Sequence, residues 1–159
     1  MRLAAFCILG AGLACAQSTE GGTQAVIQTV ERLFQAVASR DAAAMRATLL
    51  PGARFHAVRS GGVVSAGSDE EFIARITALK EEPLERMRDP RVLVSGRLAT
   101  LWAEYDFHLG GRFSHCGVDA VQLVKTQEGW KIVSLAWTVE KEECRSIPAG
   151  PRPASRPGG

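Results

Sequence analysis

Apolar residues between positions 23 and 49 recur three and four residues apart, which is the spacing of one face of an α-helix. Thr23 is a suitable N-cap for a first helix, and Asp41 for a short second helix. Pro51-Gly52 would end the second helix. The two helices would bury Val26, Val30, Leu33, Phe34, Val37, Met45 and Leu49.

The next segment combines a small hairpin with a third helix. Residues 54–58 and 63–65 have the pattern of two short strands around the turn Ser60-Gly61-Gly62. Ser68 with Glu71 three residues later forms a capping box, so a third helix is expected to begin there. Its buried side would carry Phe72, Ile73, Ile76 and Leu79.

The rest of the chain is expected to be mostly antiparallel strand. Pro83 and Pro90 bracket an aperiodic segment, which we interpret as an irregular connection. Beyond it, turns that contain glycine separate strands predicted at 91–95, 98–109, 113–125 and 130–140. Helices followed by strands indicate an α+β fold, with the helices packed on one face of a strongly curved antiparallel sheet.

Residues 1–16 have the features of a cleaved signal peptide. Arg2 gives the positive start, residues 3–13 the apolar run, and Ala14-Cys15-Ala16 the small-residue cleavage pattern. A lipid anchor on Cys15 is one alternative, although Gly12 stands where a lipoprotein signal has a large aliphatic residue. An uncleaved signal anchor is another. We expect an exported protein, periplasmic or secreted, without a stable membrane anchor.

The C-terminal residues 147–159 contain four prolines and no apolar periodicity. Such a segment cannot bury enough surface to offset the entropy of ordering it. We therefore expect a disordered tail at 147–159 and a single folded domain over residues 17–146, which is long enough to build one core.

The charges of the chain are nearly balanced. It contains 19 Lys and Arg residues against 17 Asp and Glu residues, a net charge of +2. Arg86, Arg88 and Arg91 lie close together, but acidic residues are interspersed with them. Nucleic-acid binding needs clustered cations that displace counterions from phosphates. The composition therefore argues against a nucleic-acid partner.

Two of the four cysteines, Cys7 and Cys15, would leave with the signal peptide. Cys116 and Cys144 remain, and an even pair in an oxidising compartment is typical of one disulfide. Strand counting puts Cys116 near Val139, so a bond requires the chain to fold back after the last strand. Two separate buried thiols are the alternative.

Several phrases together resemble one known superfamily. They are FQAVASRDAAAMR at 34–46, FHAVRSGGVV at 55–64, DPRV at 89–92, WAEYDF at 102–107, HCGVDAVQLV at 115–124 and GWKIVS at 129–134. Their order is similar to that of the nuclear transport factor 2-like superfamily, in its SnoaL-like bacterial branch. The resemblance covers the whole predicted domain.

This resemblance implies a cone-shaped fold with a pocket between the concave sheet face and the helices. It also implies a homodimer formed through the sheet. The superfamily includes ketosteroid isomerases, scytalone dehydratase, polyketide cyclases, transport factors and exported domains without an assigned activity. Because one fold carries so many functions, the activity has to be argued from the site residues.

Strand counting gives a first placement of the candidate site. Counting back from a two-residue glycine turn puts Asp106 opposite His115, and Trp102 opposite Asp119. Alternation would then place all four side chains on the face away from the better core. A bulge at Gly117 would return Asp119 to the core face, so the sequence leaves the register open.

The candidate catalytic residues are Asp119, His115 and Tyr105. An imidazole beside a partly desolvated carboxylate can act as a general acid or base, with the tyrosine orienting a carbonyl oxygen. The competing interpretation is a His–Asp pair at the sheet surface, which contributes little to stability. Ser114 and His115 are expected to point to opposite faces and not to contact each other.

Aromatic residues are the candidates for ligand binding. A flat ligand could lie against Trp102, Tyr105, Phe107 and Phe34, with the phenol as a polar handle. Alternatively, the aromatic residues of the sheet fill the core and a dimer interface. His56 and His108 are expected to be solvated, and no ligand spacing for a metal is present. Neither a metal nor a cofactor is expected.

Three function classes follow from these residues. The leading one is an exported domain that binds a small apolar molecule in the cone. The second is an acid–base enzyme of the isomerase, dehydratase or polyketide-cyclase type. The third is a dimeric protein-interaction module that uses the outer sheet face.

Overall fold

The computed structural model describes residues 12–142 and 144, with side chains from residue 20 onward. Most of the predicted signal peptide and the whole predicted tail therefore lie outside the described residues. In chain order the elements are α1 Gly12–Ser39, α2 Ala42–Thr48, β1 Leu49–Arg59, the 3-10 turn Ser60–Gly62, β2 Val63–Ser68, α3 Asp69–Thr77, β3 Pro83–Ser95, β4 Leu98–Leu109, β5 Arg112–Thr126 and β6 Gly129–Val139.

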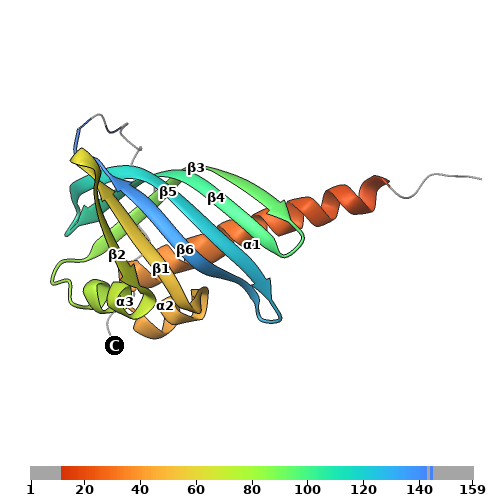
Figure 1. Ribbon diagram of the computed structural model, residues 1–159, viewed down its shortest axis with the longest axis horizontal. Helices are drawn as coiled ribbons and strands as arrows, with labels where there is room; N and C mark the ends of the chain where they lie inside the picture. The colour runs from red at the N-terminus through yellow and green to blue at the C-terminus, as the bar shows by residue number, and fades with distance from the viewer. Residues whose placement is uncertain (1–11, 143, 145–159) are drawn as a thin grey trace, which may run out of the picture.

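Six strands form one curved sheet in the order β2-β1-β6-β5-β4-β3. All neighbours are antiparallel except β1 and β6, which run parallel. The helix α1 crosses one face of the sheet, and its N-terminal end projects beyond the strands (Figure 1). This arrangement confirms the predicted α+β cone. Among the described helices, none combines the length and apolarity needed to cross a membrane.

The core lies between α1 and the concave sheet face. Every residue of the stripe predicted for the first two helices is buried, from Val26 to Leu49. These side chains pack against inward-facing residues of the central strands, which include Leu101, Val121, Leu123 and Ile132. Asp41 caps α2 as predicted, because its carboxylate accepts a hydrogen bond from the Ala44 amide at 3.0 Å.

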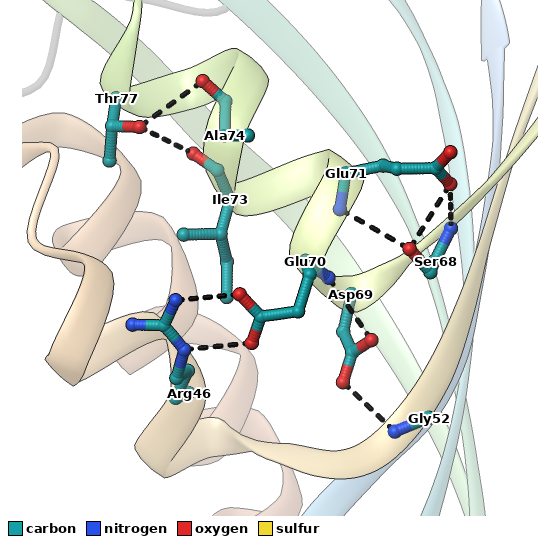
Figure 2. Close-up of polar contacts among 9 residues, drawn as sticks. All are labelled: Arg46, Gly52, Ser68, Asp69, Glu70, Glu71, Ile73, Ala74 and Thr77. Carbon is teal, nitrogen blue, oxygen red and sulfur yellow. Dashed lines mark hydrogen bonds and ion pairs between the residues drawn. The ribbon is translucent and has the colours of Figure 1, made fainter.

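The helix α3 is fixed in place by polar contacts at its N-terminus (Figure 2). Ser68 and Glu71 form the predicted capping box. Glu70 accepts two hydrogen bonds from Arg46 of α2, at 2.8 and 2.6 Å. Asp69 accepts one from the backbone amide of Gly52 in β1, at 2.9 Å. These contacts tie α3 to two other elements, so it forms a fixed wall beside the sheet.

The segment from Pro83 to Pro90 is a strand, and our interpretation of it as an irregular connection is wrong. It forms the first half of β3, the edge strand beside β4. Proline is tolerated there because an edge strand leaves one side without ladder hydrogen bonds. An irregularity between Arg88 and Arg91, with Asp89 at a φ of 47°, lets the ladder continue.

A bulge in β5 also changes the predicted register. Phe107 pairs with His115, but His108 pairs with Phe113, so Ser114 is the extra residue. Every pair beyond this point is shifted by one residue from the simple count. Asp106 therefore lies opposite Cys116 and not opposite His115. The same shift turns His115 and Asp119 toward the concave face, without a bulge at Gly117.

A second bulge, between Gln122 and Leu123, shifts the pairing of β5 with β6. As a result Cys116 pairs with Glu140, one residue beyond the predicted Val139. The chain folds back after that bridge, and the structure joins Cys116 to Cys144 with the two Cα atoms 5.9 Å apart. This distance is ordinary for a disulfide. The predicted pairing of the two cysteines is therefore the one that the structure contains.

We expect reduction of this disulfide to lower the free energy of unfolding by about 3–4 kcal/mol, because the bond closes a loop of 28 residues. Urea unfolding followed by tryptophan fluorescence, with and without reductant, measures the effect. The double variant Cys116→Ser/Cys144→Ser should match the reduced protein and not respond to reductant. Two free thiols in the denatured, unreduced protein would contradict the prediction.

Candidate functional site

A cavity of about 320 Å³ lies between the concave sheet face, α1 and α3. Its walls are mostly apolar. They are formed by Leu33, Phe34 and Val37 of α1, by Phe72, Ile76 and Leu79 in and after α3, and by Leu135, Trp137 and Val139 of β6. Two other hollows, of about 350 and 310 Å³, are lined by a larger share of polar surface. An enclosed apolar pocket with a few converging polar groups is the usual form of a small-molecule site.

The polar groups of this cavity come from different elements. Glu85 of β3, Tyr105 of β4 and His115 of β5 lie along the sheet, and Arg59 and Arg75 approach from β1 and α3. Glu85 pairs with Phe107, which in turn pairs with His115, so these residues form one row across the three strands. The sheet curvature points this row toward α1 and α3.

Glu85 and Asp119 form a pair of buried carboxyl groups. Asp119 is fully buried, whereas Glu85 keeps some accessible surface where it lines the cavity. The two side chains are close enough to share a hydrogen bond. In the described part of the chain, both oxygens of Asp119 are without a hydrogen-bond partner unless a proton is shared with Glu85. Two carboxylates cannot donate to each other, so the pair is satisfied only when it holds a proton.

Burial raises the pKa of both carboxyl groups of this pair. The pKa of Glu85 rises from 4.5 to about 8, mainly through desolvation and partly through repulsion by Asp106, while its hydrogen bond with Asp119 opposes the rise. The pKa of Asp119 is also raised, by desolvation first and then by Glu85. The pair therefore tends to hold a proton, and Glu85 is the member of it that lines the cavity.

Tyr105 is oriented by a hydrogen bond within the sheet. Its hydroxyl donates to the backbone oxygen of Thr138 at 2.6 Å. Tyr105 lies opposite Gly117, where a Cβ would stand 2.2 Å from that same oxygen. Any side chain at Gly117 would therefore displace the acceptor. Burial and the nearby carboxyl groups raise the pKa of Tyr105, so it stays a neutral phenol.

His115 lies among aromatic rings at one side of the cavity. Its ring centroid is 5.0 Å from that of Phe107 and 5.8 Å from that of Tyr105. Burial lowers the pKa of His115, and the positive charges of Lys141 and Arg59 lower it further. The Nδ1 atom lies 3.0 Å from the Ser114 hydroxyl. The expectation that these two neighbours do not touch is wrong, because the bulge at Ser114 breaks the alternation.

Some of the predicted site residues line this cavity, and others lie elsewhere in the structure. Phe34, Tyr105, Phe107 and His115 line the cavity, and Asp119 lies behind Glu85. Trp102 does not line it, because alternation from Tyr105 turns its side chain to the outer face, where it is 53% exposed. The expected placement of Trp102 in the pocket is therefore not the one observed.

Asp106 belongs to a separate cluster on the outer face. It accepts hydrogen bonds from Arg86 at 2.8 and 2.5 Å, and His108 Nε2 lies 3.3 Å from its Oδ1. The side chain of His108 is only 18% exposed, so the expectation that it is solvated is wrong. Arg88 makes a salt bridge with Glu104 beside this cluster. No group of three or more metal-ligating side chains occurs among the described residues.

Sequence reasoning missed three polar residues that line the cavity. Glu85 was overlooked because its segment was interpreted as a loop, in which a glutamate is ordinarily solvated. Arg59 and Arg75 lie at element ends far apart in the sequence. Pairing along the whole length of β4 would have been the one available signal. It extends β3 back to Pro83 and places Glu85 opposite Phe107.

The fold is an α+β cone like that of nuclear transport factor 2-like proteins. The chain belongs to the family described as "Putative lumazine-binding", whose profile matches residues 22–138. No curated protein sequence matches the chain.

Solved structures of the same fold include three bacterial proteins. One is a nuclear transport factor 2-like protein with a cystatin-like fold from Novosphingobium aromaticivorans, with TM-score 0.66, 16% identity, and coverage of 82% of this chain and 90% of that one. A superfamily protein from Salmonella enterica has TM-score 0.65, 15% identity, and coverage of 83% and 99%. A "putative dehydratase" of this family from Streptomyces avermitilis has TM-score 0.63, 18% identity, and coverage of 76% and 97%. At these identities the likeness concerns the fold alone.

The raised pKa of Glu85 predicts that stability falls as the pH rises from about 4.5 to about 8. In this window the unfolded chain loses the Glu85 proton while the folded protein keeps it, so ionisation favours unfolding by a few kcal/mol. Glu85→Gln should reduce this slope to the part that Asp119 contributes, and the variant should be more stable than the unmodified protein at pH 8. Urea unfolding at several pH values measures both effects.

The matched control for this experiment is Glu82→Gln, because Glu82 is exposed on the same part of the chain. It should leave the slope unchanged. A free energy of unfolding for the unmodified protein that is constant or rises across the window would show that Glu85 is not held protonated.

Proposed function

We propose that this protein binds a small, largely apolar molecule in the cavity between the sheet, α1 and α3. The observation that carries the proposal is the cavity itself, about 320 Å³ with mostly apolar walls and one carboxyl group, Glu85, whose pKa is raised by burial. A neutral Glu85 can donate a hydrogen bond to a carbonyl or ring nitrogen of the ligand, whereas an ionised one could only accept. A flat molecule with one such acceptor fits this chemistry.

The family name supports a flat heterocyclic ligand and makes lumazine the first compound to test. The aromatic side chains of the cavity, which include Phe107 and Trp137, offer ring faces for such a molecule. Trp137 also makes binding observable, because its fluorescence should change when a ligand replaces water beside it.

We expect Ile76→Phe to weaken binding of lumazine, or of the neutral apolar probe N-phenyl-1-naphthylamine, by at least tenfold. Ile76 lines the cavity, and the larger ring would occupy part of its volume. Ala74→Phe is the matched control, because Ala74 is exposed on the same helix and does not line the cavity. Fluorescence titration measures the dissociation constants, and thermal unfolding checks that both variants are folded.

Equal binding by the two variants would place the probe elsewhere on the molecule. No binding of either compound by the unmodified protein, together with no bound small molecule in native mass spectrometry, would contradict the proposal.

Acid–base catalysis is the second candidate function, and the buried carboxyl pair favours it. Ionised Glu85 could take a proton from a carbon next to a ligand carbonyl, with the C–H electrons moving to form an enolate, and then return the proton. Asp119 would assist by donating its hydrogen bond to Glu85. Tyr105 is a poor candidate for orienting the carbonyl oxygen, because its hydroxyl donates to Thr138.

For this second function we expect the protein to exchange the α-hydrogens of a bound flat ketone, such as 2-tetralone, for deuterium in D₂O. The rate should rise with pH up to about 8, as Glu85 ionises. NMR follows the exchange. Glu85→Gln should abolish catalysed exchange and still bind the ketone, whereas Glu82→Gln should behave as the unmodified protein. Equal exchange in both variants would exclude this role for Glu85.

We further propose that the protein is exported and dimeric. The disulfide between Cys116 and Cys144 supports an oxidising compartment. The outer sheet face exposes Trp102 and Leu98, which would suit the homodimer contact expected from the resemblance.

A further inference from the structure

Two arginines line the cavity that is otherwise mostly apolar. Arg59 lies at the end of β1, and Arg75 lies in the last turn of α3. Both are exposed residues, so they lie where the cavity meets solvent. Within the described part of the chain, neither forms an ion pair with a carboxylate. The guanidinium of Arg59 donates only to the hydroxyl of Ser65, at 2.9 Å.

The carboxylate next to Arg75 is already engaged. Glu71 precedes Arg75 by one helical turn, and its Oε2 accepts hydrogen bonds from the Ser68 amide at 2.7 Å and from the Ser68 hydroxyl at 3.1 Å. Arg75 lowers the pKa of Glu71, so the two charges interact without direct contact. The donors of the Arg75 guanidinium therefore remain available to another acceptor.

One further cation, Lys141, lies near this part of the cavity. Lys141 and Arg59 both lower the pKa of His115, which places two cations close to this ring. Glu85 is the one acidic residue among the described residues that line the cavity, and its raised pKa keeps it neutral at pH 7. The cavity thus has mostly apolar walls with one acidic residue, Glu85, and two exposed arginines, Arg59 and Arg75, among its lining residues.

We infer that the ligand is an apolar carboxylate, with its acid group bound by Arg59 and Arg75 at the opening and its apolar body between α1 and α3. Planar guanidinium groups bind carboxylates in two-point contacts, and two of them line this cavity from different elements. A carbonyl, hydroxyl or ring nitrogen at the far end of the molecule would reach Glu85. The inference rests on the proposed binding function and specifies the class of ligand.

Charge at an exposed opening contributes less than it would in a buried site, because solvent and salt screen it. We therefore expect an anionic group to improve binding about tenfold over a neutral group of the same shape. The preference should shrink as the salt concentration rises, whereas the contribution of the apolar body should not.

Calorimetric titration with 2-naphthoate and 2-naphthamide tests the inference, because these two probes share a ring system and differ mainly in charge. The unmodified protein should bind the naphthoate about tenfold more tightly at low salt. The double variant Arg59→Gln/Arg75→Gln should lose this preference while its affinity for the naphthamide is unchanged. Arg97→Gln, in the exposed β3–β4 turn, is the matched control and should keep the preference.

The other possible results each count against either the carboxylate inference or the proposed binding function. Equal affinity of the unmodified protein for both probes would overturn the carboxylate inference and leave the binding function intact. A preference that survives in the double variant would also overturn it. Failure of both probes to bind, or binding that Ile76→Phe does not weaken, would instead count against the proposed cavity function.

Discussion

The position of one extra residue, Ser114 in β5, determines which side chains of this strand face the concave side of the sheet. Without it, alternation would turn His115 and Asp119 to the outer face, and Cys116 would point inward. With it, His115 lies beside Phe107, and Asp119 comes close to Glu85. This bulge lies close to the β4–β5 turn, where the end of the strand pair can take up the extra residue through a local increase in twist. The composition of the cavity therefore depends on a small local change in backbone geometry.

The strand register brings the carboxyl groups of Glu85 and Asp119 together, and their burial raises the pKa of both. Burying an ionised carboxylate without a cationic partner is very unfavourable, so the folded protein retains the proton instead. Asp106 illustrates the opposite solution in the same sheet. It is also buried, but its carboxylate accepts two hydrogen bonds from Arg86. Two acids in one fold thus differ because only one of them meets a guanidinium group.

Local signals predicted most of the fold. The stripe of α1, the Asp41 cap and the Ser68–Glu71 capping box each depend on residues within a few positions of one another, and all were confirmed. The boundaries of β4 were predicted without error for the same reason. The first half of β3 was missed because Pro83 and Pro90 argue against strand locally, and only the neighbouring strand β4 makes an edge position available.

The sequence by itself determined the class of fold and the identity of the core stripe. Those features follow from residue type and short-range periodicity. Only the tertiary structure decided which polar residues share a cavity. Glu85, Asp119 and Arg75 are distant in sequence, and their meeting depends on strand register and on where α3 is tied down. A bulge moves every later residue of a strand to the opposite face, and its position depends on pairing with the neighbouring strand, so simple alternation counted from the turn did not locate it.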